Sequence, residues 1–313
     1  MPSARVGPER NAERKKMNVH PAAEPEPTHK PNSGLIWLAS YPKSGNTWAR
    51  IFLSNLAAIM AGETEKLELN AIARFSHSAD FQRYFEEILG FKPTAQHCNE
   101  IAAARQKVQQ KIADTYEGLI FLKTHNALVV DRGHSVVNFA VTSGAVYIVR
   151  NPLDVAISLS HHGDHSIDKA IEMMALEDSE SPVSDTLVHA VWSSWSRNVA
   201  SWTRKPHPAI LVMRYEDMLA DSLSSFTALT RHLRLDATPD QIALAVNRSS
   251  FDNLQDEEER AGFRERPQQA ERFFREGRIG QWREVLTPQQ VERVVAAHRE
   301  QMARFGYWPL DQI

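Results

Sequence analysis

The chain has 313 residues, 42% of them hydrophobic and 24% charged, and this ordinary composition excludes a chain that is disordered throughout. A formal net charge of -3 provides no global basic field, so nucleic acid and anionic membranes are excluded as general partners and any anion site must be local. The single cysteine, Cys98, excludes an intramolecular disulfide, a zinc ribbon and a redox pair. No apolar run approaches the roughly 20 residues of a membrane span, and charges interrupt any signal-peptide core, so we expect a soluble, cytoplasmic protein.

The first 33 residues differ in composition from the rest of the chain. They hold six of the sixteen prolines and ten charged residues, but no Leu, Ile, Phe, Trp or Tyr. Such a segment buries too little apolar surface to offset the entropy cost of ordering it. We therefore expect residues 1–33 to form a disordered tail and residues 34–313 to form a single domain.

Short apolar runs alternate with helical patterns from residue 35 onward. The runs have the length and continuous hydrophobicity of parallel strands covered on both faces, and they lie at 35–39, 119–122, 145–149 and 210–213. Strands that alternate with helices predict an α/β fold, with a central parallel sheet flanked by helices in three layers of the P-loop-like type.

Helical patterns follow two of these runs directly. Apolar residues recur at helical spacing from Thr47 to Met60. After the run at 145–149, Asn151 is a predicted N-cap and Pro152 suits the first helical position, so a helix is predicted over 152–160.

Three other stretches have less distinct patterns. Residues 63–117 are mostly helical in pattern without a strong strand, 288–304 place apolar residues on one helical face, and 255–278 are polar and loop-like. The last stretch contains three consecutive glutamates, which we interpret as a solvated face or as part of a loop that gates a site: Glu257, Glu258 and Glu259.

The loop after the first predicted strand has the composition of a phosphate cradle, because parallel sheets bind ligands at the carboxyl ends of their strands. Gly45 permits close backbone approach, and Lys43 adds a full charge to the N-terminus of the following helix. The Walker A spacing G-x-x-x-x-G-K-[ST] is absent, which argues against an ATPase or an ordinary kinase.

Two more polar motifs are predicted at the same sheet edge. Arg150 and Ser158 follow the third run, and helical spacing turns Ser158 toward the side of the cap residue. A guanidinium can bind two oxygens while a hydroxyl donates to a third, so this pair suits a second anion and predicts a ligand with two anionic ends. Lys123 and His125 follow the second run.

Together these motifs resemble those of the cytosolic-type sulfotransferase family, over residues 35 to 308. The stretch 41–48 resembles the family's 5'-phosphosulfate loop Tyr-Pro-Lys-Ser-Gly-Thr-Thr-Trp, with one substitution at Asn46. The stretch 150–158 is similar to its 3'-phosphate motif, and 123–125 to its catalytic triplet. Three shorter segments add to the likeness: 215–218 (Tyr-Glu-Asp-Met), 249–251 (Ser-Ser-Phe) and 274–277 (Phe-Arg-Glu-Gly).

The resemblance implies a metal-independent enzyme that moves a sulfonate from 3'-phosphoadenosine 5'-phosphosulfate (PAPS) to a hydroxyl or an amine of a small-molecule acceptor. It implies that His125 is the general base, that Lys43 stabilises the bridging oxygen, and that Lys123 contacts the sulfonate oxygens. Trp48 and Phe251 would stack on the adenine. The implied cosubstrate-binding residues are Lys43, Ser44, Gly45, Asn46, Thr47, Trp48, Arg150, Ser158, Tyr215, Ser250, Phe251, Arg275 and Gly277.

The sequence departs from the family pattern at two places. Glu276 stands where the family usually has Lys, which removes a positive charge beside the implied 3'-phosphate. The family's dimer motif is not found near the C-terminus, so both a monomer and a homodimer stay open.

Other readings remain beside this one. A P-loop-like phosphotransferase or a catalytically silent nucleotide-binding protein are the alternatives, and retention of Lys43, Lys123 and His125 argues against the second. The acceptor is expected to contact residues from 63–117, 131–144 and 161–190 and to be partly hydrophobic. A metal site is also considered for four polar residues: His161, His162, Asp164 and His165. Their spacing matches no strong pattern of metal ligands, so we favour the interpretation that they line the acceptor site or face solvent.

Overall fold

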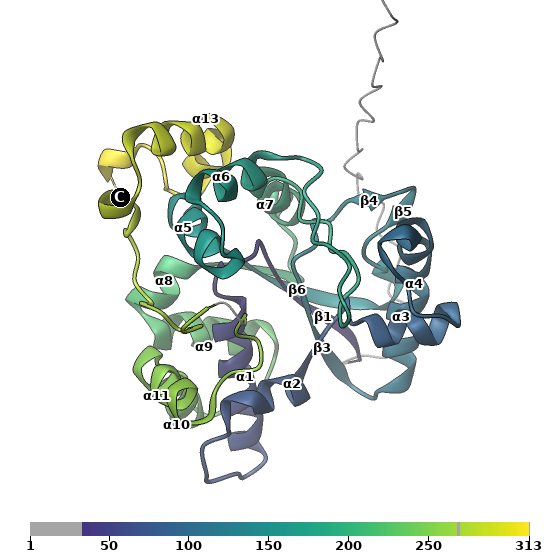
Figure 1. Cartoon of the computed structure of the whole chain (residues 1–313). Helices are drawn as coiled ribbons and strands as arrows, with labels where there is room; N and C mark the ends of the chain where they lie inside the picture. Colours follow the sequence, from purple (N-terminus) through teal and green to yellow (C-terminus); the bar gives the residue numbers. More distant parts are fainter. Residues whose placement is uncertain (1–32, 268–269, 313) are drawn as a thin grey trace, which may run out of the picture.

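A computed structural model describes residues 33–267 and 270–312 of the chain (Figure 1). The predicted tail at 1–33 lies outside the described residues except for Ser33. The predicted α/β architecture is confirmed, with one central sheet between two layers of helices. No helix among the described residues is long and apolar enough to cross a membrane.

The central sheet contains five parallel strands in the order β2-β3-β1-β6-β7. Their bounds are β1 (Gly34–Ser40), β2 (Ser76–Ser78), β3 (Leu119–Thr124), β6 (Thr142–Val149) and β7 (Ile210–Arg214). β1 is the middle strand, and Ala39 pairs with Thr124 on one side and with Tyr147 on the other. The loops that follow β3, β1 and β6 therefore lie side by side at one edge. A separate two-stranded ribbon is formed by β4 (Val130–Asp131) and β5 (His134–Ser135).

Alternate residues of β1 point into two separate hydrophobic cores. Trp37 belongs to the larger core and Leu38 to the smaller one, and each is only 1% exposed. This is the reason for the unbroken apolar run that predicted the strand, because a strand covered on both faces has no polar side.

The helices divide between these two cores (Figure 1). The larger core is covered by α3 (Gln82–Leu89), α4 (Cys98–Thr115), α5 (Pro152–Gly163), α6 (Ile167–Ala175), α7 (Trp195–Thr203), α12 (Trp282–Val285) and α13 (Pro288–Arg304). The smaller core is covered by α1 (Asn46–Met60), α8 (Tyr215–Ala220), α9 (Ser222–His232) and α10 (Pro239–Arg248). The short α2 (Ile72–Phe75) and α11 (Phe251–Ala261) lie beside the smaller core, around Leu254 and Phe263.

The start of α5 agrees with the sequence prediction. The Asn151 side chain caps the helix by accepting a hydrogen bond from the Leu153 main-chain N–H at 3.0 Å, and Pro152 occupies the first turn. The helix extends to Gly163, three residues beyond the predicted end.

Two predictions about local structure are wrong. Residues 76–78, in a region predicted to be helical, form the edge strand β2, which pairs with β3. Residues 255–261, predicted to be loop-like, belong to α11. Glu258 is not on a solvated face: it is 4% exposed, and its carboxylate accepts the main-chain N–H groups of Phe273 and Phe274 at 2.7 and 2.9 Å. The sequence pattern of α11 is polar even on its buried side, because the buried Glu258 is satisfied by main-chain N–H donors. The helix was therefore not recognised from the sequence.

Candidate active site

The loop between β1 and α1, the predicted anion cradle, lies at the carboxyl edge of the sheet. Gly45 precedes the first residue of α1 with φ of 103°, and a Cβ there would lie 2.7 Å from the Tyr215 ring. Both the left-handed backbone and the close ring therefore require glycine. Lys43 is also left-handed, with φ of 66°. Since the first amides of a 15-residue helix have no partner inside the helix, they provide donors for an anion.

Several buried polar atoms at this cradle have no hydrogen-bond partner in the protein. Two of them are the Ser44 hydroxyl, on a residue 1% exposed, and Nε of Arg150, on a residue 7% exposed. Arg150 Nη1 donates to the Lys43 carbonyl at 3.1 Å, and the guanidinium lies 4.4 Å from the centre of the Tyr215 ring. Buried donors are rarely left unsatisfied, so these atoms fit a site for an anionic ligand.

His125 lies immediately after β3 and faces the end of β1. Its Nδ1 is 2.9 Å from the Ser40 carbonyl oxygen, and since a carbonyl can only accept, Nδ1 carries the proton and Nε2 is the basic nitrogen. Burial, followed by the charge of Lys123, lowers the pKa of His125 to about 3. The imidazole is therefore neutral at physiological pH.

Lys43 lies among groups that lower its own affinity for a proton. Burial, then the charges of Lys123 and Arg150, lower its pKa to about 8. The Lys43 ammonium is 3.2 Å from Nδ1 of His162 and 4.4 Å from the centre of the Phe273 ring. Lys43, Lys123 and Arg150 thus lie close enough to affect one another's charge, although they follow three different predicted strands.

Glu265 is the counter-charge of this group. Its carboxylate receives both terminal nitrogens of Arg50, at 2.8 and 3.0 Å, and lies 3.7 Å from the Lys123 ammonium. Nearby Lys123 and Arg50 lower the pKa of Glu265 to about 2, against the opposing effect of burial. Arg50 is itself 2% exposed and donates from Nε to Ser76 of β2. A partly buried, bidentate carboxylate thus fixes two cations near the candidate base.

The late segment predicted to contact a 3'-phosphate is attached to α5 by Asp154. The Asp154 carboxylate accepts the main-chain N–H groups of Gly280 at 2.7 Å and Trp282 at 3.1 Å. Gly277 has φ of 59°, and a Cβ there would lie 2.3 Å from the Phe251 ring, so the segment packs directly on that ring. The geometry places Phe251 beside the predicted phosphate-binding glycine.

Glu276 engages the arginine that it adjoins in sequence. Arg275 donates to Glu276 at 2.7 Å and to Gln281 at 2.8 Å, and Arg278 donates to Glu276 at 2.6 Å. These three side chains are between 32% and 48% exposed, so the ion pairs are open to solvent. The Arg278 carbonyl in turn accepts from Arg150 at 3.4 Å, which links this segment to the cradle.

Several other predicted site residues are placed with contacts of their own. The Asn46 side chain turns toward β1 and donates to the Leu38 carbonyl at 2.8 Å. Trp48 donates from its indole to the Ser249 carbonyl at 2.8 Å, and its ring meets Tyr215 edge to face. Ser250 precedes α11 and accepts from Asn253 at 2.9 Å. Thr47 and Ser158 lie in the first turn of α1 and within α5, both partly buried.

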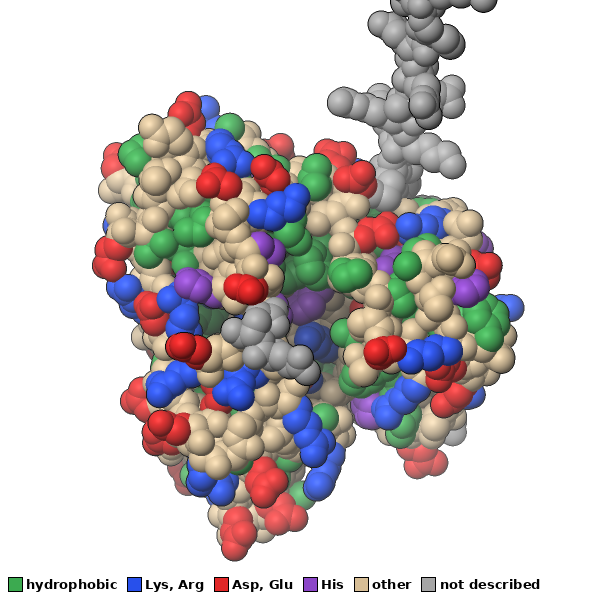
Figure 2. All heavy atoms as spheres, viewed as in Figure 1, with side chains coloured by type: hydrophobic (Ala, Val, Ile, Leu, Met, Phe, Trp, Pro, Cys, Tyr) green, Lys and Arg blue, Asp and Glu red, His purple; other side chains and the backbone are tan. Residues whose placement is uncertain are grey.

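The space-filling view shows a hollow near the centre of this face, at the place where Figure 1 labels β1, β3 and β6 (Figure 2). Histidine and basic side chains colour its interior. His162, one of the four polar residues considered above as metal ligands, contacts Lys43. Among the described residues, no three His, Cys, Asp or Glu side chains gather as a possible metal site.

The sequence analysis missed Arg50, Glu265 and Phe273. One signal was available for Arg50, because a charged residue stands between the apolar positions of the predicted helix 47–60. No local pattern identifies Glu265, which lies 215 residues from its Arg50 partner.

The chain matches the sulfotransferase domain family over residues 34–306. It therefore belongs to this family, as the motifs predicted, and its class is that of the sulfotransferases. Among curated relatives, the amine sulfotransferase of Oryctolagus cuniculus is 29% identical over 51% of this chain, a match that spans about half of that enzyme's length (54%). The flavonol 3-sulfotransferase of Flaveria bidentis is 24% identical over 90% of this chain and 86% of that protein.

Solved structures share the fold. A retinol dehydratase in complex with androsterone and the inactive cofactor PAP has a TM-score of 0.59 and 18% identity, covering 86% of this chain and 80% of that one. Mouse sulfotransferase SULT7A1 complexed with PAP has a TM-score of 0.54 and 19% identity, covering 86% of this chain and 84% of that one. At such identity the likeness establishes the three-layer fold.

Proposed function

We propose that this protein transfers a sulfonate from PAPS to a hydroxyl or an amine of a small-molecule acceptor. The observation that carries the proposal is the cradle after β1, where the unpartnered Ser44 hydroxyl and Arg150 Nε are buried beside Lys43. Lys123 lies at the end of the adjacent strand β3, and His125 follows directly after that strand. The relatives named for sulfotransferase activity and the PAP-bound structural neighbours support this choice of nucleotide.

Two anion-binding groups would hold the nucleotide. The α1 amides, Ser44 and Lys43 would bind the 5'-phosphosulfate, since a helix N-terminus and a lysine both favour negative charge. Arg150 and Ser158, with Arg275 and the Gly277 amide, would bind the 3'-phosphate. Trp48 and Phe251 would hold the adenine between them, with Tyr215 and Ser250 beside it.

The residues divide the chemical step among themselves. His125 would accept the acceptor's proton at Nε2, because Nδ1–H is held by the Ser40 carbonyl. As the acceptor oxygen or nitrogen bonds to sulfur, the bond between sulfur and the bridging oxygen breaks, and the 5'-phosphate of 3',5'-bisphosphoadenosine (PAP) retains that electron pair. Lys43 would stabilise the charge on the bridging oxygen, and Lys123 that on the sulfonate oxygens. The transfer thus depends on positioning and electrostatics.

A comparison of thermal unfolding with PAP, AMP and ATP tests the nucleotide assignment. A ligand at 100 times its dissociation constant adds about 2.7 kcal/mol, which shifts the midpoint by several degrees in a domain of this size. We expect a large shift with PAP and smaller ones with AMP and ATP. An equal shift with ATP would favour the alternative of a phosphotransferase, and no shift with any of them would contradict the proposed site.

Turnover separates an enzyme from a silent nucleotide-binding protein. Sulfonate transfer from labelled PAPS to a panel of phenols, alcohols and amines measures activity directly. A His125→Ala variant should keep its affinity for PAP and lose turnover by about a hundredfold or more. Unchanged turnover in this variant would show that another group takes the proton.

A further inference from the structure

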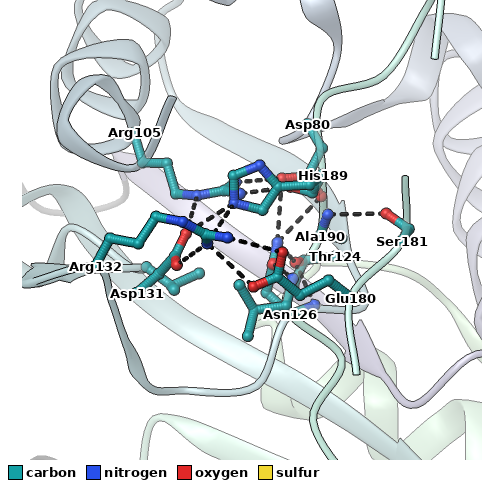
Figure 3. A network of polar contacts seen from close by, with 12 residues as sticks. Asp80, Arg105, Thr124, Asn126, Asp131, Arg132, Glu180, Ser181, His189 and Ala190 are labelled. Carbon is teal, nitrogen blue, oxygen red and sulfur yellow. Dashed lines mark hydrogen bonds and ion pairs between the residues drawn. The ribbon is translucent and has the colours of Figure 1, made fainter. Parts of the chain in front are cut away.

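The residue after His125 is the hub of a buried polar network that the reaction scheme does not use (Figure 3). His125 and Asn126 lie beyond the end of β3, outside regular secondary structure. Ladder hydrogen bonds therefore do not fix their backbone, and other groups must do so. Asn126 is 3% exposed, so its side chain is inside the protein rather than at the site.

Every polar group of Asn126 has a partner. Its side-chain NH₂ lies 3.1 Å from both carboxylate oxygens of Asp80 and 3.0 Å from the Thr124 hydroxyl, and its side-chain oxygen accepts the Val191 main-chain N–H at 2.6 Å. Its main-chain N–H donates to the Thr124 hydroxyl at 3.0 Å, and its carbonyl accepts from the Trp202 indole at 3.0 Å. Four segments of the chain thus meet at one residue.

Asp80 is itself fixed by a charged partner. Arg105 of α4 donates to it at 2.8 Å, and both residues are at most 5% exposed. Arg105 lies 3.8 Å from Asp131, which receives His189 at 2.9 Å, and Arg132 connects this group to Glu180 (Figure 3). Because Asp80 is buried and paired with Arg105, its hydrogen bonds to the Asn126 amide are strong and directional.

Asparagine suits this position better than its isosteres. The site needs a donor toward Asp80 and an acceptor toward Val191 N–H, and an amide supplies both. A carboxylate at position 126 would face the Asp80 carboxylate at the distance of the present 3.1 Å contact. An apolar residue at position 126 would leave both the Asp80 carboxylate and the Val191 main-chain N–H without their hydrogen-bond partner.

We propose that Asn126, anchored by Asp80, is a positioning residue for the reaction: it holds the backbone at 125–126 so that His125 keeps Nδ1 on the Ser40 carbonyl and Nε2 toward the acceptor. The inference rests on the proposed role of His125 as the base. A second contact acts in the same direction, since Asn198 of α7 donates to the His125 carbonyl at 3.0 Å. A displacement of about 1 Å at a reacting group can cost on the order of a hundredfold in rate.

The test compares Asn126→Ala with Gln109→Ala. Gln109 is a matched control because it is also a buried amide, 4% exposed, that bridges two main-chain groups: it donates to the Val136 carbonyl at 2.8 Å and accepts from Asn138 N–H at 2.6 Å. Both variants should lower the unfolding midpoint. Asn126→Ala alone should lower kcat by about tenfold or more, with the affinity for PAP changed by less than about twofold.

A double-mutant cycle shows whether Asn126 acts through the base. If it does, Asn126→Ala should have no further effect on kcat in a His125→Ala background. An equal loss in both backgrounds, or a loss no larger than that of Gln109→Ala, would overturn the inference while His125 stays the base. If His125→Ala itself keeps full kcat, the proposed base is wrong, and the role of Asn126 is wrong with it.

Asn126→Asp gives an independent readout that a merely structural role would not produce. Two carboxylates this close share a proton, so the pKa of the pair is raised, with Arg105 on the far side of Asp80 opposing the rise. We expect kcat of this variant, relative to the wild type, to recover as the pH falls from 8 toward 5.5. A ratio that stays constant over this range would contradict the role of the Asp80–Asn126 contact.

Discussion

At the scale of single residues, the lowered pKa of Lys43 is the property that can be measured most directly. Burial and two neighbouring cations hold the pKa of its ammonium at about 8. Above that pH the free protein loses the positive charge that would stabilise the bridging oxygen, so kcat/KM should fall as the pH rises through 8. No acid limb near 6.5 is expected, because the pKa of His125 is already about 3.

A Lys43→Arg variant tests this assignment. The guanidinium of the new arginine stays charged at every accessible pH, so the alkaline limb of the pH profile should disappear. The maximal rate should fall, because a planar guanidinium presents its N–H donors in a different geometry from an ammonium. A limb that persists unchanged near pH 8 would assign the ionisation to another group. The measurement is a pH profile of kcat/KM for both proteins.

Glu265 should oppose the binding of an anion. Its carboxylate lies 3.7 Å from Lys123 and interacts electrostatically with Lys43, which is proposed to bind the 5' end of the nucleotide. Glu265→Gln should therefore tighten PAP binding by about fivefold, or roughly 1 kcal/mol. The same change leaves the buried Arg50 without its bidentate partner and should lower the unfolding midpoint. Calorimetric titration with PAP measures the first effect. Glu259→Gln is the control, since Glu259 is 72% exposed and pairs weakly with Arg272.

At the scale of elements, Asp154 joins the N-terminus of α5 to the segment 275–282. Its two hydrogen bonds are made by a buried carboxylate, so Asp154→Ala should release this segment and weaken PAP binding by on the order of tenfold. Hydrogen exchange of residues 275–285 should become faster in the variant. Glu284→Gln removes only an exposed ion pair with Arg278 in the same segment and should leave both measurements unchanged.

The elements also show what the sequence could predict. The strands β1, β3 and β6, the start of α5 and the cradle with Gly45 follow from apolar runs, an N-cap and turn chemistry, all of which are local. β2 escaped prediction because its residues Ser76–Ser78 are polar and only pairing with β3 makes them a strand. The partners of Glu265, and those of Asn126 other than Thr124, lie far away in sequence. Such contacts are decided by packing rather than by any local pattern.

At the scale of the whole molecule, stability should fall in mild acid. His298 of α13 is 1% exposed, and burial lowers its pKa to about 4, whereas an unfolded chain has a histidine pKa near 6.5. Between these values the unfolded chain binds a proton that the folded one resists. The free energy of unfolding therefore decreases as the pH falls from 6.5 to 4, by up to about 1.4 kcal/mol per pH unit for each such histidine.

A His298→Asn variant isolates the contribution of this histidine to the pH dependence of stability. It keeps a polar group near Ser196, which lies 3.0 Å from Nδ1 of His298, and it removes the proton-binding group. The unfolding midpoint of the variant should depend less steeply on pH than that of the wild type between 6.5 and 4. Replacement of the exposed His134 by Asn is the control for a histidine at the surface.

The burial of His125 beside Lys123 has a consequence for the timing of catalysis. An imidazole with a pKa near 3 binds a proton weakly, so we expect His125 to be a weak base in the nucleotide-free protein. A bound polyanion would cancel part of the surrounding positive charge and raise the basicity of His125. Proton affinity and nucleotide affinity then support each other reciprocally. We therefore expect His125, the proposed base, to accept a proton more readily when the donor nucleotide is bound.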